Sequence, residues 1–600
     1  MHGVIAARID LLEAAARDAL RRCSVVGRVF WPDAVDVDEQ VVAPLSRTGL
    51  ISDQSDSVMA GMREFAFKHA LTRDVVYATL PRPERRELHR RVAEWIQDVA
   101  PDRGVETAEL AAYHYSQAIA YGENDPAVSR RAFELLLTAS EAAYERAGLQ
   151  EARLQLDQAL ELATDDRQRA AALLGLARLD QTEGLHESAL ERLDALEGLL
   201  GPDDRQLRSE ALGWRSRVCW LTGRWDEALS SAEAAIQSLA GLPESRQLAQ
   251  ALARRSQLEM LKHHPDTIEH SNEAIAVARR VGDSFAEVNA QINLVTEQAT
   301  LGVAPDPAEL LAMVALARDA GAYEEAYRAI VNFVWSGVGY LPVSRIEAVT
   351  LEARQLVADM PPPQSIGAYL ELSDAAMLLV PAGRWAEVDQ VLARYEGGPE
   401  IATARILWLT LMGGLALRRG DVKTAAPLLT ELRSIAISSR EPQRIIPMAC
   451  VVLPWLMLVG EGDDLRSLTE RLVLSLDGDW PIVLTIVPIV RVLAAARETE
   501  LLSRVVDSVR RTPHVAGVLE TSLAAAEGLL ALEQGRTEDG IEQLRAAVAA
   551  EHEMGFTYAA ACLGLDLASA LEVAGDTSAA EEVREGSSSV LEKLGCVNPF

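Results

Sequence analysis

Glycines spaced about 40 residues apart constrain the fold of this chain more than any other feature of its sequence. Each stands between two helical patterns, and a small or apolar residue follows a few positions later, as in LTGRWDEAL around Gly223 and LRRGDVKTAA around Gly420. Gly184 and Gly223 lie 39 residues apart, and Gly535 and Gly575 lie 40 residues apart. Such a period is typical of stacked helical hairpins, in which each unit buries its apolar face on its neighbours.

Each marker glycine is expected to end the first helix of a hairpin, because Gly adopts the left-handed conformation at lower cost than other residues. The region of His263 fills the place expected between two markers, and the remaining markers are Gly148, Gly302, Gly339, Gly383 and Gly460. About eleven or twelve hairpins fit between residues 126 and 600. They resemble tetratricopeptide repeats with a period longer than the usual value of about 34 residues.

The composition favours helices and argues against one class of partner. Hydrophobic residues make up 49% of the chain and aromatic residues only 5%. Ala, Leu, Glu and Arg, which lose little side-chain freedom in a helix, are abundant. The formal net charge is −31, so the chain lacks the surplus of Lys and Arg that attracts nucleic acid. We predict an all-α fold, an α-solenoid of tetratricopeptide-like hairpins, and do not expect nucleic acid as a partner.

Neither a membrane span nor a secretory signal is expected. The apolar runs Ile445–Val459 and Trp480–Val490 are shorter than the roughly 20 residues that cross a bilayer, so we interpret them as buried helices. Met1–Leu20 carries charges where a signal peptide needs an apolar core. The five Cys are scattered, with no pair at metal-ligand or redox spacing. These features predict a cytoplasmic protein.

The first 125 residues follow a different pattern. The expected elements are helices over 4–22, 70–80 and 84–99 and extended segments over 50–52 and 64–68, where Phe65 and Phe67 share a face. Helices with a small β-hairpin are typical of a winged helix. We therefore predict a winged-helix-like domain over residues 1–125 and a repeat solenoid over 126–600. Irregular stretches at Gly337–Pro342 and Pro361–Pro363 predict a bend near residues 340–365.

Three segments of the N-terminal domain resemble a known family: GVIAARIDLL at 3–12, CSVVGRVFW at 23–31, and FAFKHALTRDVVYATL with RRELHRRVAEW at 65–95. They resemble the module that links the NTPase core to the repeats in bacterial STAND-type signal-transduction regulators, which include adenylate or guanylate cyclases and large transcriptional regulators. The likeness covers about the first 120 residues and extends beyond them only as architecture. It implies a winged helix that bound nucleotide holds against an NTPase core until a signal releases it.

The resemblance also implies a role for His69, in FKHAL. It matches a His that reaches the nucleotide phosphates in the closed state of the family. Imidazole can donate a hydrogen bond to phosphate and changes charge near neutral pH. Because the sequence lacks an NTPase core, this contact requires an NTPase domain in trans. Otherwise His69 only caps the junction between strand and helix, and the sequence implies no cofactor of its own.

A phosphate-binding loop is missing from the sequence. That loop needs Gly-x-x-x-x-Gly-Lys-Ser/Thr, and no Lys of this chain follows a Gly. The sequence also lacks Gly-x-Ser-x-Gly, His-Glu-x-x-His and any local Cys/His arrangement, so we predict that the chain is not an enzyme. Since the resemblance places Met1 near the middle of the family's architecture, we expect a truncated, split or mis-started product.

One predicted helix is basic within this acidic chain, because it carries Arg82, Arg85, Arg86, Arg90 and Arg91. These side chains could contact DNA phosphates, as some winged helices do, dock on an acidic neighbouring domain, or form a solvated face. The family uses this module for packing between domains. We therefore favour docking or a solvated face.

Two further groups have structural explanations that we favour. The run Lys262–His264, with His270, could ligate a metal, but no Cys or second cluster supports a site there. Trp225 and Trp385 each follow Gly-Arg in equivalent turns. Packing between adjacent hairpins is favoured for them over a place on a binding surface.

Together these observations predict a non-catalytic sensing and interaction module of a STAND-type regulator. It would bind a protein or a small-molecule inducer on its helical repeats. The expected protein partner is an NTPase, a cyclase or a DNA-binding protein. Two alternatives stay open: the C-terminal fragment of a larger ATPase or nucleotide cyclase, with its catalytic domains upstream, or a fragment of a transcription regulator.

Overall fold

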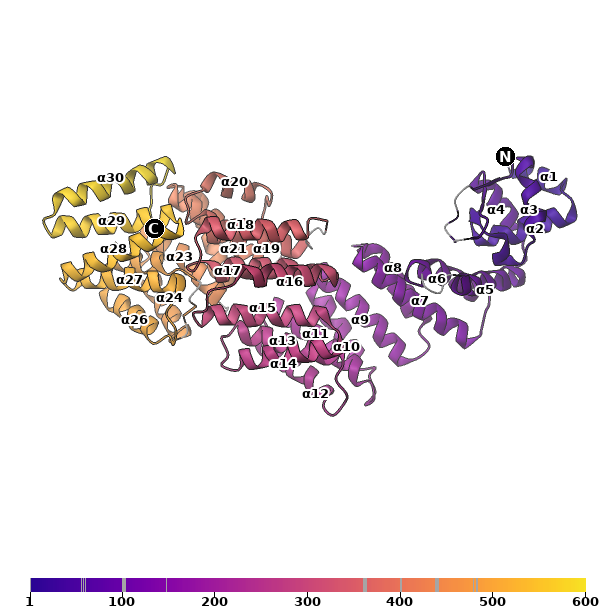
Figure 1. Ribbon diagram of the computed structural model, residues 1–600, viewed down its shortest axis with the longest axis horizontal. Coiled ribbons are helices and arrows are strands. Elements are labelled where there is room, and N and C mark those ends of the chain that lie inside the picture. The colour runs from indigo at the N-terminus through magenta and orange to yellow at the C-terminus, as the bar shows by residue number, and fades with distance from the viewer. Residues whose placement is uncertain are drawn as a thin grey trace. The chain divides into compact units, whose positions relative to one another are not determined.

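The chain divides into two compact units, Met1–Ala211 and Leu212–Phe600. The computed structural model describes residues 2–54, 57, 59, 61–99, 104–146, 148–359, 364–399, 402–437, 442–478, 480–481 and 484–600. Helices dominate both units, and Figure 1 shows them following one another as antiparallel hairpins.

The N-terminal unit begins with helices around a three-stranded sheet. Its elements are α1 (His2–Asp10), α2 (Ala14–Val26), β1 (Val29–Phe30), the 3-10 turn η1 (Pro32–Val35), α3 (Glu39–Val42), the 3-10 turn η2 (Ala43–Thr48), β2 (Ile51–Asp53), β3 (Phe65–Phe67) and α4 (Ala70–Ala78). The strands are antiparallel in the order β1-β3-β2, with Val29 opposite Ala66. Phe65 and Phe67 lie on the buried face of β3, which confirms the predicted shared face.

The single helix predicted over residues 4–22 is wrong, because the chain turns between α1 and α2 and leaves Leu11 86% exposed. Tertiary packing accounts for the break. α1 contacts α4, whereas α2 contacts α4, α3 and also α5 (Arg82–Val99). Helical periodicity alone does not reveal a turn that leaves the apolar spacing intact. The other predicted helices and strands of this domain are confirmed to within a few residues.

The rest of the N-terminal unit consists of helices, most of which pack on the next one along the chain. They are α5 (Arg82–Val99), α6 (Gly104–Ala120), α7 (Pro126–Glu145), α8 (Leu149–Leu162), α9 (Asp166–Thr182), α10 (His186–Glu197) and the first part of α11 (Arg205–Leu221). Their facing side chains, such as Ile96, Leu136 and Leu176, are buried.

The C-terminal unit continues the hairpins to the end of the chain. Its helices are the last part of α11, α12 (Trp225–Ser238), α13 (Arg246–Met260), α14 (Thr267–Val281), α15 (Ser284–Thr300), α16 (Pro307–Asp319), α17 (Tyr323–Gly337), α18 (Val343–Leu356), α19 (Gln364–Asp374) with the π-helical turn η4 (Ala375–Leu379), α20 (Trp385–Ala393), α21 (Ala402–Arg418), α22 (Val422–Ala436), α23 (Pro442–Val459), α24 (Gly462–Ser475), α25 (Val487–Ala495), α26 (Thr499–Arg510), α27 (Gly517–Glu533), α28 (Thr537–Met554), α29 (Thr557–Val573) and α30 (Thr577–Lys593).

These hairpins form two layers. From α13 to α29, each odd-numbered helix contacts the next odd-numbered helix as well as the even-numbered helix that follows it. We call the odd-numbered helices the inner layer. Because inner helices are covered on several sides, α23 and α25 are apolar almost all round, and the interpretation of both apolar runs as buried segments is confirmed for the described residues. Among the described residues, no helix is both long and apolar enough to span a membrane.

Left-handed glycines end the inner helices, as predicted. Gly223, Gly420 and Gly575, which follow α11, α21 and α29, have φ values of 77°, 83° and 85°. His263 takes the equivalent place after α13 with a φ of 52°. The prediction is wrong at Gly148, whose φ is −81°, because its N–H bonds back to the carbonyl of Ala143 (2.8 Å) without a left-handed residue.

The predicted fold class is confirmed: this is an all-α chain of tetratricopeptide-like hairpins with a small strand-containing region near its N-terminus. In the described residues, α7 to α30 make twenty-four helices, which matches the number needed for the eleven or twelve hairpins expected. The domain limits 1–125 and 126–600 stay predictions, although α7 begins at Pro126. The bend near 340–365 also stays a prediction, and residues 360–363 lie outside the described residues.

Candidate functional site

His69 is the residue before α4, with an extended backbone and an exposed side chain. The side chain makes no capping hydrogen bond to the helix. Instead the His69 carbonyl accepts hydrogen bonds from the N–H groups of Thr72 (2.9 Å) and Arg73 (3.4 Å). The junction is therefore closed by backbone atoms, and the proposed contact of the imidazole with phosphate stays a prediction.

The first arginines of the basic helix α5 are engaged within the N-terminal unit. Arg85 donates to the carbonyl of Tyr77 (3.1 Å), and its guanidinium lies 4.5 Å from the centre of that ring. Arg82 donates to the carbonyl of Ala120 (3.3 Å). Arg86 is half-buried, and its Nε has no hydrogen-bond partner among the described residues.

The later arginines of α5 form ion pairs. Arg90 pairs with Glu87 (2.8 Å) and Glu94 (2.7 Å) on its own helix, and Arg91 pairs with Asp36. Carboxylates therefore already neutralise two of the five charges that would contact phosphates or a partner. The role of these arginines as an interaction surface stays a prediction.

A buried network lies beneath α5 that the sequence did not indicate. Tyr77 Oη lies 2.9 Å from Nε2 of His89 and donates to Oη of Tyr121 (3.0 Å). Nδ1 of His89 lies 2.8 Å from Nδ1 of His114. Burial, with the charges of Arg73 and Arg85, lowers the pKa of His89 to about 3. The imidazole is therefore neutral, and both its nitrogens have partners inside the chain.

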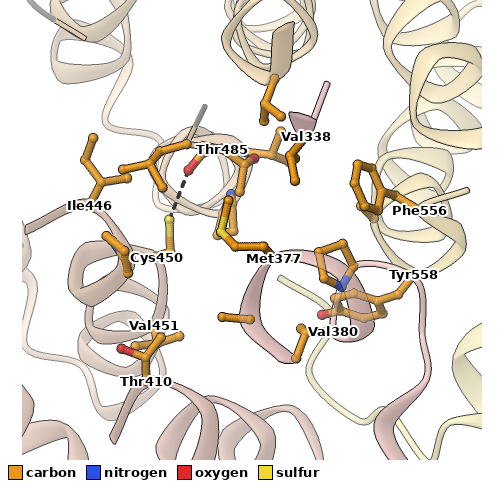
Figure 2. Close-up of a pocket in the computed structure, with 18 of the residues that line it drawn as sticks. Val338, Met377, Val380, Thr410, Ile446, Cys450, Val451, Thr485, Phe556 and Tyr558 are labelled. Carbon is orange, nitrogen blue, oxygen red and sulfur yellow. Dashed lines mark hydrogen bonds between the residues drawn. The ribbon is translucent and has the colours of Figure 1, made fainter. Parts of the chain in front are cut away.

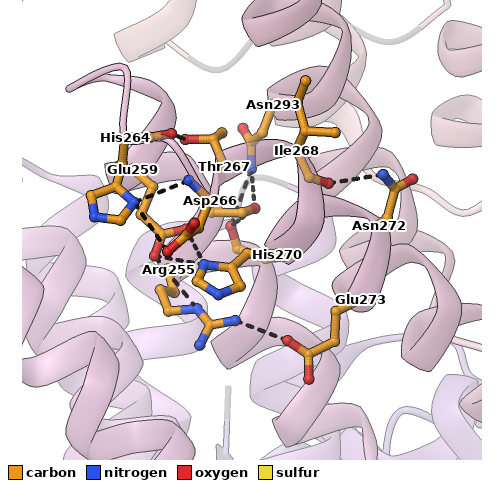
Figure 3. Close-up of polar contacts among 12 residues, drawn as sticks. Arg255, Glu259, His264, Asp266, Thr267, Ile268, His270, Asn272, Glu273 and Asn293 are labelled. Atoms are coloured by element: carbon orange, nitrogen blue, oxygen red, sulfur yellow. Dashed lines mark hydrogen bonds and ion pairs between the residues drawn. The ribbon is translucent and has the colours of Figure 1, made fainter.

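Several side chains around Lys262–His264 contact one another. His270 Nδ1 lies 2.8 Å from Glu259, and His264 Nδ1 accepts the N–H of Asp266 (3.3 Å). Figure 3 shows Arg255 and His270 meeting at Glu259. Within the described part of the chain, no three His, Cys, Asp or Glu side chains gather as metal ligands would.

The two turn tryptophans pack against other side chains, as predicted. Trp225 lies under the ammonium group of Lys262, 4.9 Å from its ring centre. Trp385 is 2% exposed and meets Tyr558 edge to face, with ring centres 5.0 Å apart. Tyr558 belongs to α29, so Trp385 joins distant segments of the sequence, and it also packs against Arg419 of the next hairpin, whose guanidinium lies 5.9 Å from the ring centre.

Near this contact lies a cavity of about 160 Å³ inside the C-terminal unit. Every inner helix from α17 to α29 contributes to its wall, α19 through its π-helical turn η4. Figure 2 shows Ile446 and Cys450 of α23 on one side, Phe556 and Tyr558 on the other, and Met377 of η4 between them. π-Helical turns occur often at functional sites.

Two hydrogen-bonded contacts close the inner layer around the cavity. The carbonyl of Pro381 accepts from the N–H groups of Tyr558 (2.9 Å) and Ala559 (3.3 Å), and Thr557 Oγ1 donates to Ala382 O (2.6 Å). The first N–H groups of a helix have no partner within it. The turn after η4 therefore caps α29, which lies about 175 residues further along the chain.

The second contact is made by the last residues. The N–H groups of Val597 (2.8 Å) and Asn598 (3.0 Å) donate to the carbonyl of Arg418, and Asn598 Nδ2 donates to that of Leu417 (2.8 Å). These carbonyls end α21 and lack partners within their own helix. The Phe600 ring lies under the Arg418 guanidinium, at 4.2 Å, and lines the cavity.

Gly339, after α17, makes a third contact. Its φ is +86°, and a Cβ there would lie 2.3 Å from the backbone nitrogen of Val518 in α27. Only Gly fits this approach. We call the inner helices α17 to α29, joined by these three contacts, the closed ring.

Most polar groups in the cavity wall are already hydrogen-bonded. Arg418 Nε donates to Tyr558 Oη (2.9 Å), which donates to the carbonyl of Phe600 (2.8 Å). Cys450 Sγ donates to Thr485 O (3.3 Å). Burial raises the pKa of Cys450 to about 12, so the thiol stays protonated at neutral pH.

The exceptions are the indole N–H of Trp335, which has no hydrogen-bond partner among the described residues, and Glu551, in the last turn of α28. Glu551 lines the cavity and is only 6% exposed. Its carboxyl group has no hydrogen bond or ion pair with any described residue. Burial raises the pKa of Glu551 to about 8. A buried polar group without a partner costs free energy, and strongly shifted groups in cavities are candidates for function.

No protein-family model matches the sequence, and no curated protein matches it. Several solved structures are similar in fold. The APC/C hetero-tetramer Cut9–Hcn1 aligns over 86% of this chain and 88% of its own, with 12% identity and a TM-score of 0.45. The STAND protein PH0952 from Pyrococcus horikoshii, with a tetratricopeptide repeat sensor, aligns over 82% of this chain and 65% of its own, with 12% identity and a TM-score of 0.39. A Rap protein complexed with competence and sporulation factor aligns over 66% and 98%, with 11% identity and a TM-score of 0.37. Each is a likeness of helical architecture, and none indicates what this chain binds.

Proposed function

We propose that this chain is a non-catalytic sensing module of a STAND-type regulator, and that a small-molecule inducer binds in the cavity of the closed ring. The observation that carries the proposal is the cavity itself, whose wall comes from seven inner helices and retains one unpartnered acid. Sites for small molecules are typically apolar hollows with few polar groups.

A ligand in this cavity would stabilise the closed ring. Trp335 of α17 and Tyr558 of α29 both line the cavity, although more than 200 residues separate them in the sequence. A molecule that touches both ends of the ring binds the closed form better than an opened one, and so shifts the equilibrium toward closure. In this proposal, sensing means that ligand binding raises the population of the closed form.

The N-terminal domain supports the output half of the proposal, in which a winged-helix-like domain acts on an NTPase, a cyclase or a DNA-binding protein. Its order is helix, strand, helical segments, strand, strand, and β3 lies between β1 and β2, as in a winged helix. In this proposal His69 reaches phosphate only on an NTPase domain in trans. The exposed side of α5, including Arg82, is the docking face.

Fluorescence titration of the full chain with the neutral apolar dye N-phenyl-1-naphthylamine tests whether the cavity is a binding site. We expect one saturable site per chain. Ala376→Phe fills the cavity from η4 and should weaken binding by about 30-fold or more.

The matched control is Ala393→Phe, at the exposed end of α20, which should bind like the unchanged chain. The proposal fails if the unchanged chain shows no saturable binding, or if the two Phe variants bind the dye equally well.

A further inference from the structure

The cavity wall restricts the body of a ligand to apolar groups. Val338, Met377, Val451 and Phe556 are among the side chains that line it, and they come from four different parts of the ring. Most of this wall offers dispersion contacts, and its unpartnered polar groups are the Trp335 indole N–H and the Glu551 carboxyl group. An alkyl chain or a ring system fits this surface, whereas a sugar or a nucleotide would leave its polar groups unpaired.

The cavity wall includes the unpartnered carboxyl group of Glu551. The other charged side chain of the wall, Arg418, donates to Tyr558 and stacks on Phe600, and makes no ion pair with Glu551. Burial is the only cause that raises the pKa of Glu551, so no neighbouring charge acts on this acid. A carboxyl group in apolar surroundings, with no cation beside it, gains most from a cation that arrives with the ligand, because charge-assisted hydrogen bonds are the strong ones.

We infer that the cavity binds an amphiphilic amine, with its hydrocarbon body among the inner helices and its basic nitrogen hydrogen-bonded to Glu551. The inference rests on the proposed function and names its ligand class. On binding, the proton of Glu551 leaves to solvent and the carboxylate faces the ammonium group. The rings of Phe556 and Tyr558, which also line the cavity, offer the ammonium group further favourable faces.

Calorimetric titration of the full chain with three ligands of one chain length tests this inference at pH 7.5: n-octylammonium, 1-octanol and octanoate. We expect octylammonium to bind about tenfold more tightly than octanol, and octanoate to bind more weakly than octanol. In Glu551→Gln the advantage of octylammonium over octanol should fall to less than about twofold, while the affinity for octanol stays within about twofold. The retained affinity for octanol shows that the variant is folded.

Glu553→Gln is the matched control, because Glu553 is an exposed acid in the same turn of α28. It should keep the full preference for octylammonium. If octylammonium binds no better than octanol, or keeps its advantage in Glu551→Gln, the inference is overturned. If all three ligands bind equally and Ala376→Phe abolishes their binding, the proposed function stands and only the amine class is wrong. If none of the three binds and the dye does not bind either, both fail.

Discussion

The network beneath α5 and the cavity of the closed ring both bury polar side chains. They differ in whether the buried group has a hydrogen-bond partner within the chain. His89 has partners on both ring nitrogens, Tyr77 and His114, and both belong to the chain. Glu551 has no partner among the described residues, and burial holds its carboxyl group in the protonated form at neutral pH. A group whose hydrogen bonds are satisfied within the chain, such as His89, stabilises the fold, whereas a group left unsatisfied weakens the fold until a ligand completes it.

The largest expected effect is the pH dependence of stability that Glu551 causes, and it tests the cavity side of the comparison. The folded-state pKa of Glu551, about 8, lies above that of an unfolded Glu, so the folded chain holds the proton more tightly. Stability from this group is therefore fully present at pH 4 and is lost as the pH rises to 8. Relative to Glu551→Gln, the free energy of unfolding of the unchanged chain should fall by on the order of 4 kcal/mol over this range.

Urea unfolding of both chains between pH 4.5 and 8.5 measures this difference. Glu553→Gln serves as the control and should follow the unchanged chain. Parallel pH profiles for the unchanged chain and Glu551→Gln would mean that Glu551 is not a buried, unpartnered acid.

The next effect tests the N-terminal side. Here the substitution should lower the free energy of unfolding, whereas Glu551→Gln should raise it at high pH. Tyr77→Phe removes the hydroxyl group that joins His89 to Tyr121. It leaves a buried imidazole nitrogen without its partner, so the variant should lose about 1–3 kcal/mol of stability. Thermal unfolding measures the loss. Tyr323→Phe, at an exposed tyrosine, should change stability by less than about 0.5 kcal/mol. No loss in Tyr77→Phe would remove the contrast.

The smallest effect separates the surface of α5 from the network beneath it. Arg91 and Asp36 form an ion pair whose side chains are 38% and 70% exposed. Solvent screens such a pair, so Arg91→Ala should cost less than about 1 kcal/mol. A double-mutant cycle with Asp36→Ala measures the coupling. A coupling energy well above that value would show that this ion pair is part of the buried framework.

The glycine period and the apolar spacing were sufficient to predict the hairpins, because both are local consequences of helix geometry. Gly223 and Gly575 turn left-handed after their helices as expected. The turn between α1 and α2 could not be predicted, since it depends on contacts with α4 and α5 rather than on local sequence.

The candidate sites also differ in what the local sequence can predict and what depends on tertiary contacts. The arginines of α5 stand out in the sequence, yet several of them serve contacts within their own unit, as Arg85 does with Tyr77. Glu551 lies in AAEHEMGF, beside the exposed Glu553, and nothing in that segment separates the two acids. Glu551 faces the cavity of the ring, whereas Glu553 points away from it on the same helix. The signal that could have pointed to it is the helical phase, which places Glu551 four residues after Ala547, a buried position of α28.

The cap that Pro381 provides for α29 has a consequence for the order in which the protein is made. In an open solenoid each hairpin folds against the one just synthesised. Here the carbonyl of Pro381 must wait for N–H groups that a ribosome adds about 175 residues later, roughly 10 to 35 s at ordinary rates of synthesis. Until then the inner faces of α17 to α23 have no opposite wall, and they are open to chaperones or to other chains. The contacts that close the ring are therefore complete only after residues 556–600 have been made, and under the proposed function ligand binding must wait for them.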